Sequence, residues 1–259
     1  MTSKAPAISV NDSASSPTEE ATAPVIRDDT VSGMVARHLL DKISRQKLRP
    51  GDSVDSEVQI GRELQVSRGS VREAYRILAA LGVLEIGNGR RPRVLAMSSS
   101  ALAQIFGHAL LTAHATPLHV LELRRGIEVH GAQLAARLAS EQQLTRLRLL
   151  ADDMRIAVHD DAQRMACDLA IHTTLAEASG NPLHTLVLAA LNTAITESLT
   201  NDYAARRTEA ELIRIVDAHD TIVDRVCARD PVGAGAAMAC HFDLSINSLF
   251  RGRNLQSLT

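Results

Sequence analysis

The stretch that decides the fold covers residues 67–81 and reads SRGSVREAYRILAAL. Ser67 is a residue type preferred at helix N-caps, and Gly82, directly after the stretch, is typical of a helix end. Between these two signals the apolar side chains recur at helical spacing, at Val71, Ala74, Tyr75, Leu78 and Leu81. The stretch therefore predicts a helix with one buried face that starts at Ser67 and stops at Gly82.

Two further helices are predicted before this one. The first is amphipathic, begins at a cap near Asp29–Thr30 and ends before the turn at Pro50–Gly51. The second covers residues 56–64, with Ser53 or Asp55 as its expected cap.

A β-hairpin is predicted after the third helix. Residues 83–86 and 93–95 have strand character, and the Gly-Asn-Gly sequence at 87–89 is a hairpin signal. Three helices and a hairpin within roughly 70 residues are typical of a winged helix-turn-helix. We place this predicted domain at residues 28–97.

The rest of the chain predicts an all-α antiparallel helical bundle over residues 98–250. Its pattern is helical with about seven segments, broken at Thr116–Pro117, Ser140, Asp160–Asp161, residues 180–182, residues 200–206 and Asp230–Pro231. Residues 1–27 are rich in Ser, Thr, Ala and Pro and predict a disordered tail, and residues 251–259 form a C-terminal tail. The fold class is thus mostly α.

Composition agrees with helices and excludes several classes of protein. Of the 259 residues only 2% are aromatic and none is Trp, which suits close-packed helices and disfavours a β-sandwich or barrel. The 28 Lys and Arg against 30 Asp and Glu give a net charge of −2, which excludes a uniformly basic protein that coats polyanions. Three Cys, no long apolar run and no secretory signal predict a cytoplasmic protein with no membrane partner.

The charge is distributed unevenly between the two predicted domains. Residues 28–95 hold 12 basic and 9 acidic residues, a net of +3, whereas residues 96–259 hold 14 basic and 18 acidic residues, a net of −4. The basic excess therefore lies in the segment where DNA binding would require it.

The third helix has a row of three arginines on one face. Arg68, Arg72 and Arg76 are spaced i, i+4, i+8, away from the apolar stripe, where guanidinium groups could bind phosphates or guanine edges. The small residues Ser67, Gly69 and Ser70 at the helix start would allow its amides to approach a phosphate. The alternative is a solvated face whose charge is balanced by Glu63, Glu73 or Glu85.

The predicted wing adds a second group of arginines. Gly89, Arg90 and Arg91, followed by Arg93, place positive charge at the hairpin tip. A basic helix and a basic wing in one small domain favour DNA binding over a merely solvated surface. Since one recognition helix contacts only a few base pairs, we expect a homodimer on a palindromic operator in double-stranded DNA.

The run from Pro50 to Leu84, with its Val-Ser-Arg-x-x-Val-Arg-Glu-Ala core at residues 66–74, resembles the DNA-binding domain of the GntR family. The resemblance implies that Arg68 and Arg72 contact DNA from the recognition helix and that the turn at Gly89 enters the minor groove. Two departures are Val58, where relatives often have a basic residue, and Arg90–Pro92, where many relatives have a Gly-rich tip.

In the helical domain, Asp168 and His172 stand at i, i+4 and so face the same side of one helix. Two later helices each offer one more imidazole, His219 and His241. Three imidazoles and a carboxylate suit Zn, Ni, Mn or Fe and leave coordination positions for a ligand. Spacing alone leaves the alternative that these are ordinary core polar groups in a domain with many histidines.

Five segments in order across residues 120–245 resemble the FCD domain, the effector-binding domain of the FadR-like branch of that family. They are residues 123–128, 168–172, 178–181, 218–219 and 237–241. The resemblance implies that Asp168, His172, His219 and His241 bind a divalent metal, Zn first among the candidates. It also implies a small-ligand regulator, because the acyl-CoA-binding member lacks the metal site. Ile171 departs from the family's Phe.

Arg124 lies in the same resembling region and is expected to line the cavity. There it would hold the carboxylate of an effector together with the metal. The alternative is a surface ion pair with Glu128, four residues on. Cys167 and Cys240 each precede an expected ligand by one residue, so they should pack as small core residues and not bind the metal.

These observations predict a metabolite-responsive transcriptional regulator, a repressor released by a small carboxylate bound at the metal site. A metalloenzyme that activates water at the Asp/His site is the alternative, although no separate general base or nucleophile stands out. A third possibility is a structural metal in a scaffold without an effector.

Overall fold

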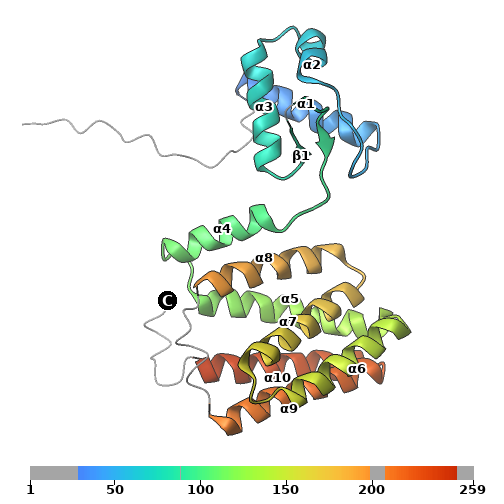
Figure 1. Ribbon diagram of the computed structural model, residues 1–259, viewed down its shortest axis with the longest axis vertical. Helices are drawn as coiled ribbons and strands as arrows, with labels where there is room; N and C mark the ends of the chain where they lie inside the picture. Colours follow the sequence, from blue (N-terminus) through green and yellow to red (C-terminus); the bar gives the residue numbers. More distant parts are fainter. Residues whose placement is uncertain (1–28, 88, 199–207, 250–259) are drawn as a thin grey trace, which may run out of the picture. The chain divides into compact units, whose positions relative to one another are not determined.

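The computed structural model describes residues 29–87, 89–198 and 208–249 (Figure 1). The described residues form two compact units: one consists of those up to 48 together with those in 52–92, and the other of 49–51 together with those from 93 to 249. The predicted tails at 1–27 and 251–259, the predicted break at 200–206 and Asn88 of the hairpin lie outside the described residues.

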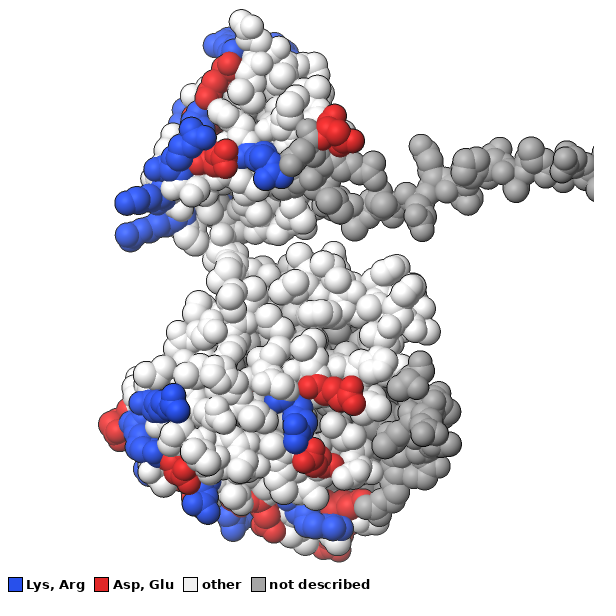
Figure 2. All heavy atoms as spheres, turned by 180° about the vertical axis from the view of Figure 1, so that it is seen from behind, with Lys and Arg blue, Asp and Glu red and all other residues white. Residues whose placement is uncertain are grey.

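The N-terminal unit has the element order of a winged helix-turn-helix. It contains α1 (Val31–Arg45), α2 (Glu57–Leu64), α3 (Arg68–Ala80) and β1 (Leu84–Glu85). The strand β1 pairs with β2 (Arg93–Val94), which begins directly after residue 92, to form a two-stranded hairpin. The strands are shorter than the sequence predicts, with two residues each. Figure 2 shows that Lys and Arg outnumber Asp and Glu on the visible face of this unit, whereas both kinds alternate over the C-terminal unit.

Side-chain caps fix where these helices begin. Thr30 Oγ1 accepts a hydrogen bond from the Gly33 amide at the start of α1, and Ser67 Oγ accepts one from the Ser70 amide at the start of α3. The cap of α2 is Ser56, so the expectation of Ser53 or Asp55 was wrong. Ser56 is the cap because it forms a reciprocal pair of hydrogen bonds with Gln59: the Gln59 side chain accepts from the Ser56 amide, and Ser56 Oγ accepts from the Gln59 amide. Ser53 and Asp55 are too far upstream to form this pair.

The three helices enclose a small core beneath α3. The side chains with at most 1% exposure are those of Val35, Ala36, Leu39, Ile60, Val71, Ala74, Tyr75, Leu78 and Leu84. The predicted apolar stripe of α3 is therefore buried, except for Leu81, which is 39% exposed at the helix end. The hydroxyl of Tyr75 donates to the backbone carbonyl of Asp55 at 2.5 Å, so the one buried polar group of the stripe is satisfied.

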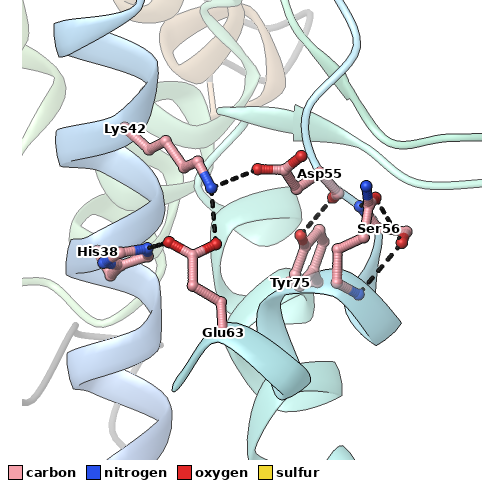
Figure 3. A network of polar contacts seen from close by, with 7 residues as sticks. His38, Lys42, Asp55, Ser56, Glu63 and Tyr75 are labelled. Atoms are coloured by element: carbon pink, nitrogen blue, oxygen red, sulfur yellow. Dashed lines mark hydrogen bonds and ion pairs between the residues drawn. The ribbon is translucent and has the colours of Figure 1, made fainter. Parts of the chain in front are cut away.

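A polar network holds α1 against the helix-turn-helix (Figure 3). Lys42 Nζ lies 2.6 Å from Asp55 Oδ2 and 2.7 Å from Glu63 Oε2, and His38 Nε2 lies 3.1 Å from Glu63 Oε1. The hydrogen bonds to the two carboxylates raise the pKa of Lys42 above its ordinary value. Since Lys42 is on α1 and Glu63 is on α2, the network links these two helices, and α3 packs against both.

Seven helices follow in the described part of the chain, the number that the sequence predicts. They are α4 (Ser100–Leu111), α5 (Pro117–Leu138), α6 (Glu141–Ile156), α7 (Asp161–Ala178), α8 (Pro182–Ser198), α9 (Glu209–Cys227) and α10 (Pro231–Leu249). Ser140 and Asp160 cap α6 and α7 with their side chains, at two of the predicted breaks. None of the described helices is both long and apolar enough to cross a bilayer.

The core of the C-terminal unit lies around α5, which packs against α7, α8, α9 and α10 (Figure 1). Three alanines of α5, Ala132, Ala135 and Ala136, have no exposed surface, and such small side chains let neighbouring helices approach closely. α7, α9 and α10 each bury one face against this centre, and those faces carry the polar group described next.

Candidate metal centre and nucleic-acid interface

Four side chains from three helices meet inside the C-terminal unit. Asp168 and His172 come from α7, His219 from α9 and His241 from α10, and their potential ligand atoms all lie within 4.8 Å of one another. The three histidines are 0–4% exposed, whereas Asp168 keeps a partly exposed side chain. The i, i+4 spacing on α7 therefore puts both of its residues on the face that meets α9 and α10.

The three imidazole rings lie against one another. The ring centroids of His219 and His241 are 4.3 Å apart, and that of His172 is 5.4 Å from His219 and 5.1 Å from His241. Phe242 borders the cluster, with its ring 5.3 Å from that of His241. Three buried imidazoles this close cannot all be protonated, because each positive charge would disfavour the next.

The hydrogen bonds leave two nitrogens of the cluster without a partner. His219 Nδ1 lies 2.8 Å from the backbone carbonyl of Ile215 and donates to it, which turns Nε2 toward Asp168. That Nε2 lies 3.0 Å from Asp168 Oδ1 but without the alignment of a hydrogen bond, and His241 Nδ1 also has no partner. A buried unpaired nitrogen costs roughly 1–3 kcal/mol, and a divalent cation would satisfy both atoms. The donor set thus fits a metal.

At Asp168 and His241 the electrostatics favour the protonation states that a metal ligand needs. At His172, burial lowers the pKa, but the charge and the hydrogen bond of Glu128 raise it above its ordinary value. Burial raises the pKa of Asp168, but the close contact with His219 and the charges of the three histidines more than offset this and hold it well below its usual range. Burial, together with the neighbouring His219 and His172, holds the pKa of His241 well below its ordinary value. A carboxylate and a neutral imidazole are the forms that bind metal.

Arg124 and Glu128 adjoin this cluster from α5. Arg124 Nε donates to Glu128 Oε1 at 2.8 Å, and Glu128 Oε2 accepts from His172 Nδ1. The pair anticipated as a surface alternative therefore forms, but it is buried, with side-chain exposures of 11% for Arg124 and 5% for Glu128. The Arg124–Glu128 pair is buried and not at the surface because Glu128 also contacts the buried His172. The guanidinium carbon of Arg124 also lies 5.5 Å from the centre of the Phe242 ring.

Glu128 is a site residue that sequence reasoning missed. Its spacing of four residues from Arg124 is visible in the sequence. Its contact with His172 joins positions 44 residues apart, and no local sequence pattern predicts such a contact. Burial raises the pKa of Glu128, but the charges of Arg124 and His172 outweigh this effect and bring the pKa below its usual value.

The two cysteines beside the candidate ligands differ. Cys167 is buried, as expected of a small core residue, but Cys240 is exposed, so that expectation was wrong. The cause is the helix rotation of about 100° per residue, which at Cys240 turns the side chain from the His241 face of α10 to solvent.

The arginines of α3 lie on its solvent face. Arg68, Arg72 and Arg76 are all exposed, as are Ser67 and Gly69 at the helix start, and Ser70 is partly exposed. The expected acidic balance is slight, because Arg76 Nη1 lies 3.8 Å from Glu73 with both side chains more than half exposed. Glu63 is engaged by Lys42. This face therefore keeps its positive charge.

The wing carries its arginines in two ways. Gly89 has a φ of +71°, a conformation that suits glycine in a tight turn, and Arg90 and Arg91 next to it are exposed. Arg93, in contrast, donates from Nη1 to the backbone carbonyl of Gly51 at 2.9 Å and so braces the hairpin. All three wing arginines are exposed, and Arg93 also has this structural contact.

Comparison with known proteins gives matches over both units. Residues 31–94 match the family of bacterial regulatory proteins, gntR family, and residues 119–244 match the FCD domain. The HTH-type transcriptional repressor NanR of Cronobacter sakazakii is 33% identical over 85% of this chain and 84% of its own length. The HTH-type transcriptional regulator LutR of Bacillus subtilis is 29% identical over 77% of this chain and 92% of its own.

A solved structure is similar as well. Streptococcus agalactiae GntR superimposes with a TM-score of 0.62 at 26% identity, and the match covers 84% of this chain and 99% of that chain. Both the order of the domains and their folds are therefore shared with a known architecture.

Proposed function

The chain belongs to the GntR family of bacterial regulatory proteins and carries an FCD domain, and from this premise we propose that it is a transcriptional repressor released by a small carboxylate. That it is a transcriptional regulator and not an enzyme follows from the family, which removes the metalloenzyme alternative. The observation that carries the finer proposal is the buried Asp/His cluster with two unpaired nitrogens beside Arg124.

DNA binding is assigned to the domain at residues 28–97. Arg68 and Arg72 are the proposed base and phosphate contacts in the major groove, with Arg76 on the same face. Arg90 and Arg91, at the Gly89 turn, would follow the backbone or enter the minor groove. The basic side chains in Figure 2 belong in part to this unit, and their exposure supports the assignment.

The start of α3 complements these arginines. The side chain of Ser67 is used to cap the helix, whereas Gly69 and Ser70 leave little bulk around its first amides. Amides at a helix N-terminus favour an anion such as a DNA phosphate. A homodimer formed by the domain at 98–250 would present two such helices to a palindromic operator.

The metal would be held by Asp168, His172, His219 and His241. One carboxylate and three imidazoles suit Zn first, with Ni, Mn or Fe as the other candidates. When bound, the cation supplies Lewis acidity and an open position for an effector oxygen. The chain's own part is to keep Asp168 ionised, to keep His241 neutral and to exclude water from the three histidines.

Arg124 is the proposed partner of the effector's carboxylate. Its hydrogen bond to Glu128 uses Nε, and no hydrogen bond from its two terminal nitrogens is found among the described residues. A guanidinium in this state can still donate two parallel hydrogen bonds to a carboxylate. The side chain is mostly buried, so such a pair would be screened little by solvent.

The name of one of the two relatives supports the direction of regulation. NanR of Cronobacter sakazakii is named a transcriptional repressor, and LutR of Bacillus subtilis is named a transcriptional regulator. We therefore propose that this chain represses in the absence of its effector.

The test measures operator affinity by fluorescence anisotropy while a panel of small mono- and dicarboxylates is titrated, with and without a chelator. We expect one or more carboxylates to weaken operator binding only in the metal-loaded protein. R124A should abolish this response while metal content stays at about one per chain. R125A is the matched control, since Arg125 is next on α5 but pairs with Asp243 at the surface.

A response that persists in R124A, or in H219A, would contradict the proposed effector site. Metal at about one per chain with no response to any carboxylate in the panel would favour the structural-metal alternative.

A further inference from the structure

Glu128 contacts both halves of the proposed effector site. It lies on α5, which supplies none of the four candidate metal ligands, and it is 6% exposed. One carboxylate oxygen, Oε1, accepts from Arg124 Nε at 2.8 Å, and the other, Oε2, accepts from His172 Nδ1. A single buried carboxylate thus joins the candidate metal ligand to the candidate anion-binding residue.

The contact with His172 determines which nitrogen can bind a metal. An imidazole that donates Nδ1–H to a carboxylate has its lone pair on Nε2, and the hydrogen bond fixes the ring's orientation and makes Nε2 more basic. His219 is oriented in the same way by the carbonyl of Ile215. His172 differs in having an ionised acceptor, which withstands the partial positive charge of a coordinated imidazole better than a neutral carbonyl does.

The contact with Arg124 leaves that side chain ready for an anion. Glu128 engages Nε, and the guanidinium lies 5.5 Å from the centre of the Phe242 ring, so the group is held from two sides. Within the described part of the chain its terminal nitrogens make no hydrogen bond. Glu128 therefore restrains Arg124 without using up its capacity to bind a carboxylate.

We propose that Glu128 is a positioning residue that couples the metal centre to Arg124, by fixing the tautomer of His172 and the orientation of the guanidinium with its two oxygens. This inference rests on the proposed function, in which a metal and an effector bind at this site. It adds Glu128, which contacts neither the metal nor the effector in that proposal. Its direct consequence is that metal affinity depends on a side chain that does not touch the metal.

The experiment uses Zn²⁺ alone as the probe, in full-length protein, with affinity measured by competition against a chromophoric chelator. E128A should weaken Zn²⁺ binding about 10- to 100-fold, the usual effect of losing such a partner. E128Q should weaken it less, by about three- to tenfold, because the amide oxygen can still accept from Nδ1 but has no charge. D243A is the matched control: it breaks a surface ion pair between α5 and α10, with Arg125, and should change affinity less than about twofold.

A second readout separates positioning from a general loss of structure. In ¹⁵N-histidine NMR of the Zn²⁺-loaded protein, His172 should be protonated at Nδ1 in the wild type and in E128Q, and should lose this fixed tautomer in E128A. If E128A does not fold, the Zn²⁺ affinities of E128Q and D243A are compared, and equal affinities would overturn the proposal. A Zn²⁺ affinity of E128A within about twofold of that of the wild type would overturn it as well. H219A distinguishes a failure of the proposed metal centre from a failure of the role of Glu128. If H219A still binds Zn²⁺, the metal centre is refuted. If H219A loses Zn²⁺ binding and E128A does not, only the role of Glu128 is refuted.

Discussion

The two units of this regulator carry their proposed sites in opposite ways. In the N-terminal unit, Arg68, Arg72 and Arg76 belong to one helix and point into solvent. In the C-terminal unit, the candidate metal ligands come from α7, α9 and α10, and the three histidines among them are buried. An exposed charge costs the fold little, whereas a buried unpaired polar group costs free energy until a ligand arrives.

This difference separates function from stability in one unit and links them in the other. Truncating an exposed arginine of α3 should change DNA binding and leave folding almost unaffected. Removing a ligand of the Asp/His cluster should change metal binding and, through it, the free energy of unfolding, because a ligand that binds only the folded chain stabilises it. The predictions below test this contrast, from the largest expected effect to the smallest.

The largest effect is expected for H219A and H241A. Each removes one of four ligands, so metal content measured by elemental analysis should fall from about one per chain to near zero. With Zn²⁺ at 100 times its Kd, the wild type should gain about 2.7 kcal/mol in unfolding free energy, and the variants should gain almost none. H108A is the control, because His108 is an exposed histidine of α4 outside the cluster.

A wild-type protein whose thermal midpoint does not respond to chelator would contradict this link between metal and stability. So would an H219A variant that is stabilised by Zn²⁺ as strongly as H108A.

The next effect in size concerns R68A and R72A. Either substitution should weaken specific operator binding by about 1–3 kcal/mol, measured at fixed salt, because a bidentate contact to a base edge is lost. Metal content and the thermal midpoint should stay at wild-type values. R45A is the comparison, since Arg45 is 79% exposed on α1 and pairs with Asp41. Equal affinities for R68A, R72A and R45A would refute the docking of α3.

The same contrast explains what could be predicted from the sequence. The helix at 67–81 carries its cap, its apolar stripe and its arginines within one local pattern, so both its fold and its exposed face were predictable. The spacing of Asp168 and His172 was equally visible. That His219 and His241 lie beside them depends on how α9 and α10 pack, which spacing does not encode, and there the family resemblance supplied the expectation.

Some details escaped prediction because neighbours compete for one role. Ser53, Asp55 and Ser56 are all suitable caps, and only the reciprocal bond with Gln59 selects Ser56. Cys240 was assigned to the core, although a single residue's rotation on α10 exposes it. Glu128 depended on a tertiary contact with His172. Each of these requires the packed structure.

A smaller effect is expected within the N-terminal unit for Y75F. The Tyr75 hydroxyl donates to the Asp55 carbonyl at 2.5 Å in a buried position, and its removal leaves that carbonyl without this partner. We expect a loss of about 1 kcal/mol in the unfolding free energy of this unit, measured by urea denaturation. Zn²⁺ affinity should be unchanged, because Tyr75 is in the other unit. A coupled loss of metal binding would show that the two units are not independent in stability.

The smallest effect is expected for R76A, which tests how little an exposed charge contributes. Arg76 is 64% exposed and lies 3.8 Å from Glu73, a pair that should contribute less than about 0.5 kcal/mol to folding. If Arg76 contacts only a phosphate, R76A should weaken operator and non-operator DNA to a similar extent and lower the slope of log affinity against log salt by about one. R68A should instead lose its preference for the operator. A loss of specificity in R76A as large as that in R68A would mean that all three arginines contact bases, and the exposed face of α3 would then enter the groove along its whole length.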